Sequence, residues 1–564
     1  MKRSYFLQLA GLLIVLLPIG LKAQNSNALS IYEGERIHAV YFTFKDLPSD
    51  TLSAINVKQK VENTFKIYPY THYSEFQTEY YLAQIRRFPF VETAILDVTM
   101  PGEGGVQLTI TVTLTTRKEM TKNTFPVIYM DKRSYLTLRF AASEMAYSNN
   151  NAWFGQPTAL LTNNPLADAP VGKGYTGWLE GFVMGGAYGI TKIIPRMNLH
   201  LYGGASYIAS FSAGRELFTD RSRFYGAVED AFVGLVGGKR SLNGHNFSYN
   251  VLYGRKQFVL GNGWLIVNTS MNGQKRAGLQ INPRWAAKNL FQAGITWDKL
   301  LLQAFQMRPN ELPIFNSHTI INGLNLELGT NSQIQPAISV LHSPRSDVRY
   351  YLPDGSSHTR NGLWVYNLRF FGNQPANRPG LFYKTEVGYQ TNPHFKMRAY
   401  AGYAQAGWNF TRTPGAPAVS YRFAYFSGDN PATVAYERWD ALYTGGNGEQ
   451  WVQGSNMYKI VQNSNEMSHL VQLVYSPFPK IQTVTQIWAF LAPQTNNLGG
   501  NPALSVLQSN YYGTELNLTV KYFHSRRWYF HLNTALTFPG EAIRDIVPDT
   551  KSWFCLMAFA RYSL

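Results

Sequence analysis

Four consecutive segments of the chain alternate apolar or aromatic positions with polar or small ones. In the first segment, Trp364, Tyr366 and Leu368 share one parity, and Arg369 lies on the other. Successive side chains of a β-strand point to opposite faces, so each segment predicts a strand with an oily face and a polar face. All four lie between Gly362 and Asp429. We interpret residues 362–429 as the stretch around which the rest of the chain is organised.

The composition of the two faces distinguishes a membrane barrel from a soluble sandwich. A sandwich buries Val, Ile and Leu and exposes charged residues. Here the oily parity is rich in Tyr, Trp and Phe, and the other parity mixes Gly, Ala, Asn and Arg. That balance is typical of strands that face lipid on one side and water on the other. The pattern favours an all-β transmembrane fold, an antiparallel outer-membrane β-barrel.

Similar segments, separated by Gly, Asn, Pro and Asp, recur to the end of the chain. Bacterial barrels have even strand numbers, and the segments predict about 18 strands, within a range of about 16 to 20. The final segment, Trp553 to Leu564, keeps aromatic and apolar residues on alternate positions. It is similar to the terminal signal that barrel assembly machinery reads. The other expected strands are 135–145, 175–188, 197–211, 224–236, 247–256, 290–298, 300–307, 321–328, 334–342, 469–478, 484–492, 512–523 and 528–538.

The region before the barrel has a different pattern. It predicts a strand over 36–44, a helix over 50–65 and a second helix from Ser74 to Gln84. Two further strands are expected over 90–100 and 106–114, around a turn rich in Gly. The order β-α-α-β-β predicts a small α+β domain over residues 31–118, followed by the barrel over residues 124–564.

The first residues are typical of a secretory signal. Met1, Lys2 and Arg3 precede an apolar run over residues 6–21, and Ala23 is followed by a polar stretch. The run is shorter than the roughly 20 residues of a membrane-spanning helix. We expect residues 1–23 to be removed, which places the barrel in the outer membrane and the small domain in the periplasm. An uncleaved anchor is the alternative.

Composition narrows the chemistry. Cys555 is the only cysteine, so neither an intrachain disulfide framework nor a cysteine metal site is expected. The formal net charge is +17. Such basicity is compatible with nucleic acid or an acidic membrane surface, but for an exported barrel we expect no nucleic-acid partner. Two interpretations stay open: an electropositive lumen that favours anions, and basic loops that face anionic lipid.

Charged residues within the expected strands are the candidates for lining the pore. A base that faces lipid at the bilayer midplane costs roughly 2–4 kcal/mol, so these residues are expected to point inward. Guanidinium groups there would bind carboxylates in a bidentate manner. The alternative is that some of them pair as struts with the acids. The expected lumen residues are Arg369, Lys384, Lys396, Arg398, Arg422, Lys521 and Arg561, with the acids Glu386 and Glu515.

The N-terminal domain resembles a POTRA domain, a periplasmic module that precedes some outer-membrane barrels. The resemblance rests on the expected strand at Ile37, Val40 and Phe42, on the helix end at residues 83–86, and on the strands that begin at residues 88 and 106. It implies a sheet edge that accepts a strand from a periplasmic protein partner. A spacer or plug under the barrel is the plainer interpretation.

The barrel resembles the alginate export family of outer-membrane porins on three ordered motifs. The first is a strand end followed by a Gly-Asn turn, the second leads from Arg360 into a strand with Glu386, and the third is a Ser-Gly-Asp turn followed by an aromatic-Asp element. The third is expected to contribute turn formers or loop anchors rather than ligands. The motif residues are Arg255, Gly261, Ser427, Gly428, Asp429, Arg438, Trp439 and Asp440.

The resemblance implies passive passage of an anionic solute or a polyanionic saccharide, with outer-membrane lipid as the other partner. We find no nucleophile elbow, phosphate loop or metal-ligand spacing, so we expect neither an enzyme nor a cofactor. Two other classes stay open. One is a factor that inserts or secretes polypeptides, although its Arg-Gly-aromatic loop tip is not found; the other is a non-conducting structural subunit of an envelope complex.

Overall fold

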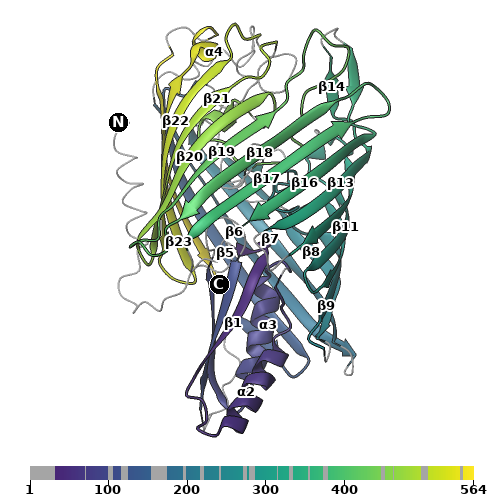
Figure 1. Cartoon of the computed structure of the whole chain (residues 1–564), viewed down its shortest axis with the longest axis vertical. Helices are drawn as coiled ribbons and strands as arrows, with labels where there is room; N and C mark the ends of the chain where they lie inside the picture. Colours follow the sequence, from purple (N-terminus) through teal and green to yellow (C-terminus); the bar gives the residue numbers. More distant parts are fainter. Residues whose placement is uncertain are drawn as a thin grey trace.

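The computed structural model consists of a large β-barrel with a small α+β domain below it (Figure 1). It describes residues 32–69, 71–99, 106–115, 125–153, 175–194, 198–215, 222–240, 243–270, 276–277, 286–313, 316–329, 334–352, 356–372, 379–445, 451–461, 463–496, 506–546 and 550–564. The expected signal segment, residues 1–23, lies outside the described residues. Among the described helices, none has the length and apolar character needed to cross a membrane.

The small domain has the expected order β-α-α-β-β. Its sheet has the order β1-β3-β2, with β1 parallel and β2 antiparallel to β3. Asp50 and Ser74 cap the two helices, because their side chains accept hydrogen bonds from the backbone N–H groups of Ser53 and Gln77. The elements are β1 (Ile37–Lys45), α2 (Thr51–Thr64), α3 (Glu75–Arg86), β2 (Val91–Thr99) and β3 (Val106–Leu114).

The core of the small domain follows from the alternation in β3. Val106, Leu108 and Ile110 on one face of this strand are fully buried. Helix α3 has seven buried residues, some facing this core and others the barrel, whereas α2 buries only Val61. Helix α3 is therefore the packing element of the domain, and α2 lies on its outside.

The barrel is closed, antiparallel and formed from 18 strands, since nine strands from β5 to β13 and nine from β16 to β24 make one ring. This confirms the expected fold and strand number. The ring contains β5 (Ser134–Asn150), β6 (Tyr175–Ile194), β7 (Leu199–Arg215), β8 (Arg223–Arg240), β9 (Asn246–Arg255), β10 (Asn289–Trp297), β11 (Leu300–Arg308), β12 (Ile320–Leu328), β13 (Gln335–Arg345), β16 (Leu363–Gly372), β17 (Gly380–Thr391), β18 (Ala399–Asn409), β19 (Ala418–Phe426), β20 (Glu466–Phe478), β21 (Ile481–Leu491), β22 (Tyr511–Phe523), β23 (Trp528–Pro539) and β24 (Trp553–Ser563).

The last strand closes the ring against the first. Strand β24 pairs with β5 from Phe554 opposite Asn150 to Ser563 opposite Ala141. The short strand β4 (Val127–Met130) pairs with β5 beyond the point where the chain ends, so it continues the line of β24. A complete antiparallel ladder leaves no sheet edge, which a bilayer requires.

The outer face of the barrel is apolar and aromatic, and the inner face is polar. On β16, Tyr366, Leu368 and Phe370 are exposed on the outside, whereas Asn367 and Arg369 are buried inside. The same alternation runs through β17 and β19. The alternate apolar and aromatic positions of the sequence thus form the lipid-facing surface.

The two ends of the barrel differ in their connections. Short turns join β8 to β9, β10 to β11, β20 to β21 and β22 to β23 at one end, and the small domain lies at this end (Figure 1). The longest connections, β9 to β10 and β19 to β20, lie at the other end. The second end also carries the hairpin of β14 (Arg349–Tyr351) and β15 (Ser357–Thr359), the turn η5 (Met457–Lys459) and the helix α4 (Glu541–Arg544).

If the outer face of the barrel contacts lipid, arginine substitutions at two neighbouring residues of β21 should change stability by very different amounts. Ile487 is half exposed on the outer face and Gln486 points inward. We expect Ile487→Arg to lower the free energy of unfolding in lipid vesicles by roughly 2–4 kcal/mol, because the charge would enter hydrocarbon. Gln486→Arg is the control and is expected to change it by less than about 1 kcal/mol. Equal losses for the two variants would contradict the assigned faces.

Candidate channel lumen

The described parts of two long connections fold back into the long-loop half of the barrel. We call residues 256–288 the β9–β10 loop and residues 427–465 the β19–β20 loop. Their backbones pair with each other, since Val267 N donates to Tyr443 O over 3.0 Å and Tyr443 N donates to Leu265 O over 3.1 Å. Phe258 and Leu260, in the described part of the first loop, are buried. The loops therefore form one packed body inside the ring.

Aromatic side chains form the centre of this body. The ring centroids of Trp264 and Trp439, one from each loop, lie 5.4 Å apart in a stacked pair. Trp451 lies 4.3 Å from Tyr403 of the barrel wall. The wall makes room at Gly388, where a Cβ atom would lie only 2.6 Å from the Trp439 ring. The glycine thus allows the tryptophan pair to approach the strand backbone closely.

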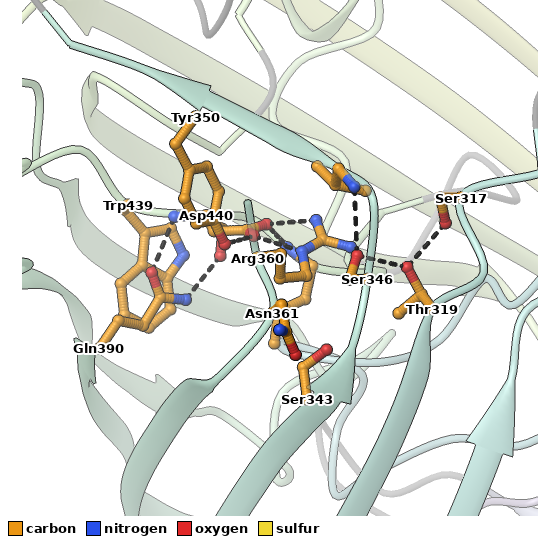
Figure 2. A network of polar contacts seen from close by, with 12 residues as sticks. Ser317, Thr319, Ser343, Ser346, Tyr350, Arg360, Asn361, Gln390, Trp439 and Asp440 are labelled. Atoms are coloured by element: carbon orange, nitrogen blue, oxygen red, sulfur yellow. Dashed lines mark hydrogen bonds and ion pairs between the residues drawn. The ribbon is translucent and has the colours of Figure 1, made fainter. Parts of the chain in front are cut away.

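An ion pair anchors the β19–β20 loop to the wall (Figure 2). Arg360 binds Asp440 with both guanidinium arms, Nε to Oδ2 over 2.6 Å and Nη2 to Oδ1 over 2.8 Å. Tyr350 donates to the same carboxylate, and Gln390 bonds the backbone of Asp440 through both of its amide atoms. Burial alone would raise the pKa of Asp440, but the Arg360 charge outweighs it and holds the pKa below its ordinary value.

A second polar cluster lies beneath the β9–β10 loop. Arg369 Nη2 bonds Glu327 Oε1 over 3.1 Å and Asn325 Oδ1 over 2.5 Å. Glu386 accepts hydrogen bonds from Asn367 and Tyr403. Arg369 and Glu386 are only 2% and 1% exposed. Both point inward as expected, but they contact protein groups rather than open water.

The remaining acids of β16 to β24 are covered in the same way. Glu515 accepts hydrogen bonds from the backbone N–H groups of Asn456 and Met457 in the β19–β20 loop. Glu466, at the start of β20, accepts from Asn463 N. Both carboxylates are fully buried. The acids on these nine strands are therefore all buried, and each accepts at least one hydrogen bond from a protein group.

Four bases on the inner face stay partly exposed, and we call them the basic inner wall. Lys384, Arg422, Lys521 and Arg561 all lie on inward parities of β17, β19, β22 and β24. Arg422 also lies over the rings of Trp451 and Trp488, at 4.7 and 5.2 Å. The accessible charges on this side of the lumen are thus all basic among the described residues of β16 to β24.

Two expected lumen residues lie elsewhere. Lys396 and Arg398 are exposed and precede β18, on the parity of the outward-facing Tyr400. Their expected inward direction is wrong, because the inner parity of β18 holds Ala399, Ala401 and Tyr403, which pack against the loops. Where the wall contacts packed loops, its inner face carries small and aromatic residues. Near β18 the bases therefore fall on the outward parity.

The motif residues build the loops rather than an open binding surface. Ser427 Oγ accepts from Tyr400 N and donates to Glu437 O, and Asp429 accepts from Glu437 N. Arg438 is buried and bonds Ser464 Oγ through Nε. Gly428 packs against Asn465, and Arg255 ends β9.

Gly261 adopts a φ of +58°, and a Cβ atom there would lie 2.5 Å from Arg369 Nη1. This glycine brings the β9–β10 loop directly against the charged cluster. The sequence analysis did not identify Glu327. This residue lies on the polar parity of the strand expected over 321–328, and Leu326 and Leu328 lie on the other parity. Arg36, whose partner comes from a distant strand, was also not identified.

At the short-turn end of the barrel, the small domain packs on the inner face of β5, β6 and β7. Phe76 of α3 packs on Tyr135 and Tyr188, with ring centroids 6.1 Å from each, and Tyr80 lies 5.5 Å from His200. These three wall residues point inward from β5, β6 and β7. Helix α3 therefore lies in the mouth of the barrel.

Comparison with known proteins gives one family match. A family model described as Alginate export matches residues 218–553. Of the curated proteins compared, none matches the chain.

Several solved structures are similar to the barrel. The outer membrane protein OpdK of Pseudomonas aeruginosa is 12% identical, with 76% of this chain and 98% of that chain covered and a TM-score of 0.42. OprD of the same organism is 9% identical, with 76% and 95% covered and a TM-score of 0.43. OccK9 (OpdG) of Pseudomonas aeruginosa is 11% identical, with 76% and 98% covered and a TM-score of 0.44.

The Arg360–Asp440 pair predicts an acid-sensitive loop. Because the pKa of Asp440 is lowered in the folded protein, its ion pair stabilises the loop at neutral pH and is lost as the pH falls below the ordinary carboxyl range. We expect Asp440→Asn to destabilise the closed loop by about 3 kcal/mol at pH 7, since Arg360 would stay buried without its partner.

Fluorescence of Trp264 and Trp439 in acid titrations of both proteins measures this effect. The wild-type protein should show an added transition below about pH 4 that the variant lacks. Identical titrations for the two proteins would contradict the anchoring role of the pair.

Proposed function

Since this chain belongs to the alginate export family, we propose that it passes anionic solutes, or exports an anionic polysaccharide, through the lumen of its barrel. Membership of the family and the closed barrel with a lipid-facing surface make the protein an outer-membrane channel. Beyond this, we propose that the cargo of the channel is anionic. The single observation that supports it is the basic inner wall.

The attraction between the lumen wall and a charged solute depends on which charged groups are exposed to the lumen. The acids Glu386, Glu466 and Glu515 are buried away from the lumen, so they contribute little to attraction of a solute. Lys384, Arg422, Lys521 and Arg561 keep exposed surface on the inner face. A lumen wall with accessible charge of one sign, such as this side of the barrel, concentrates ions of the opposite sign. Anions are therefore the expected cargo.

The same wall suits weak, repeated binding rather than tight capture. Guanidinium groups of Arg422 and Arg561 offer bidentate geometry to carboxylates, and the lysines act as point charges. Conduction requires binding that is strong enough for entry and weak enough for release. Partly hydrated bases meet that requirement. Transport without catalysis is thus part of this proposal.

The two loops set the state of the channel. Their described parts occupy the long-loop half of the lumen, and Arg360–Asp440 and the hydrogen bonds to Glu515 hold the β19–β20 loop there. Passage of a saccharide through this half requires the loops to move aside. We infer a low basal conductance for the wild-type protein and a large one once the loops are displaced.

The orientation follows from the two ends of the barrel. Outer-membrane barrels have short turns on the periplasmic side and longer loops outside. We propose on this basis that the short-turn end and the small domain lie in the periplasm. The β-α-α-β-β order supports a POTRA-like domain over residues 31–118, before a barrel over 124–564. A periplasmic protein that adds a strand to its sheet edge is the partner we propose for it.

Selectivity measured in planar bilayers tests the cargo proposal. To obtain measurable current, residues 257–285 are replaced by a short Gly-Ser turn. In this opened background we expect a clear preference for chloride over potassium, read from the reversal potential in a salt gradient. Neutralising Lys384, Arg422, Lys521 and Arg561 to Gln should remove most of the preference, because the accessible charge of the wall would be lost.

Lys396→Gln combined with Arg398→Gln is the matched control, because these bases are exposed outside the lumen. That variant should keep the anion preference. A cation preference in the opened background, or equal losses in both sets of variants, would contradict the proposal.

A further inference from the structure

A charged side chain of the small domain enters the barrel. Arg36 immediately precedes β1, and its Nη1 lies 2.6 Å from Glu327 Oε2 on the inner face of β12. The two side chains are 15% and 4% exposed. A buried carboxylate needs charged or hydrogen-bonding partners, so Arg36 satisfies a group that belongs to the barrel wall.

The same carboxylate connects Arg36 to the β9–β10 loop. Glu327 Oε1 binds Arg369, whose guanidinium lies against the backbone of Gly261 in that loop. The next residue, Asn262, donates to Tyr403 of β18, which in turn donates to Glu386. Arg36, Glu327, Arg369 and Gly261 therefore form one continuous series of contacts from the small domain to the loop that fills the lumen.

Other contacts hold the domain in the mouth without touching this series. Gln84 of α3 donates to Asp131 O, and Arg526 in the β22–β23 turn donates to Leu96 O of β2. Glu75 pairs with Arg139 of β5 at 3.6 Å. Docking is therefore spread over several sites, but Arg36 is the residue through which docking reaches the charged cluster.

We propose that the small domain is an autoinhibitory latch: Arg36 completes the Glu327–Arg369 cluster that supports the β9–β10 loop, so release of the domain opens the lumen. This regulation rests on the proposed channel function. While the domain is docked, Arg369 is held between Glu327 and Gly261. Once Arg36 withdraws, Glu327 lacks one of its two cationic partners, and the cluster that the loop packs against reorganises. Displacement of the domain is then coupled to movement of the loop.

Single-channel recording of the full-length protein tests the latch. We expect Arg36→Gln to raise the open probability by about tenfold or more, since loss of one partner of a buried ion pair is strongly unfavourable for the docked state. Arg36→Lys keeps the charge and should stay close to wild type. Lys45→Gln removes the same charge from the exposed far end of β1 and should have no effect.

Amide hydrogen exchange in nanodiscs gives a second readout that does not depend on conduction. In Arg36→Gln, exchange should become faster in residues 75–86 of α3 and in residues 256–270 of the β9–β10 loop together. Faster exchange in α3 alone, with unchanged exchange in the loop, would overturn the coupling.

The opened variant that lacks residues 257–285, together with Asp440→Asn, separates failure of the latch from failure of the channel. If these opened variants conduct and Arg36→Gln behaves like wild type, the latch is wrong and the channel function stands. If neither opened variant conducts, the channel function is wrong and the latch falls with it. Increased opening in Arg36→Gln, without increased opening in Arg36→Lys or Lys45→Gln, would support the latch.

Discussion

An 18-stranded ring encloses more space than its own inward side chains can fill, and this constraint shapes the rest of the structure. The space must hold either water or protein. In the long-loop half it holds protein, because Trp264, Trp439 and Trp451 occupy it. Wall groups in this half are removed from water, and each charged group there consequently requires a partner. In the short-turn half, beside the small domain, Lys521 and Arg561 of the inner face stay partly exposed.

This division explains why the charges of the inner face fall into two groups. Glu386 and Glu515 lie where the loops cover the wall, and both accept hydrogen bonds there. Glu327, near the short-turn end of β12, is paired with Arg36 of the small domain and with Arg369. Lys521 and Arg561 lie toward the short-turn end and keep contact with water. The acids of the first group thus pair with groups that cover the wall, whereas the bases of the second group stay partly exposed.

Much of the barrel could be predicted from the sequence, because lipid imposes a simple rule on alternate residues. Tyr366, Leu368 and Phe370 identify the outer face of β16 without any knowledge of neighbouring strands. The rule fails where the wall meets the loops: in β18 the inner face carries Ala401 and Tyr403, so Arg398 looked inward and lies outside. The paths of the two loops, and pairs such as Arg36 with Glu327, join residues far apart in sequence, and no local pattern reveals them.

The central claim is that the loops cover the inner face in the long-loop half, whereas bases near the short-turn end stay accessible to solvent. Single cysteines in a Cys555→Ser background test it through their reaction with a membrane-impermeant thiol reagent. Cysteine at position 521 should react rapidly, whereas cysteine at position 517, which is 3% exposed on the same strand, should react slowly. Equal rates at positions 517 and 521 would contradict the account.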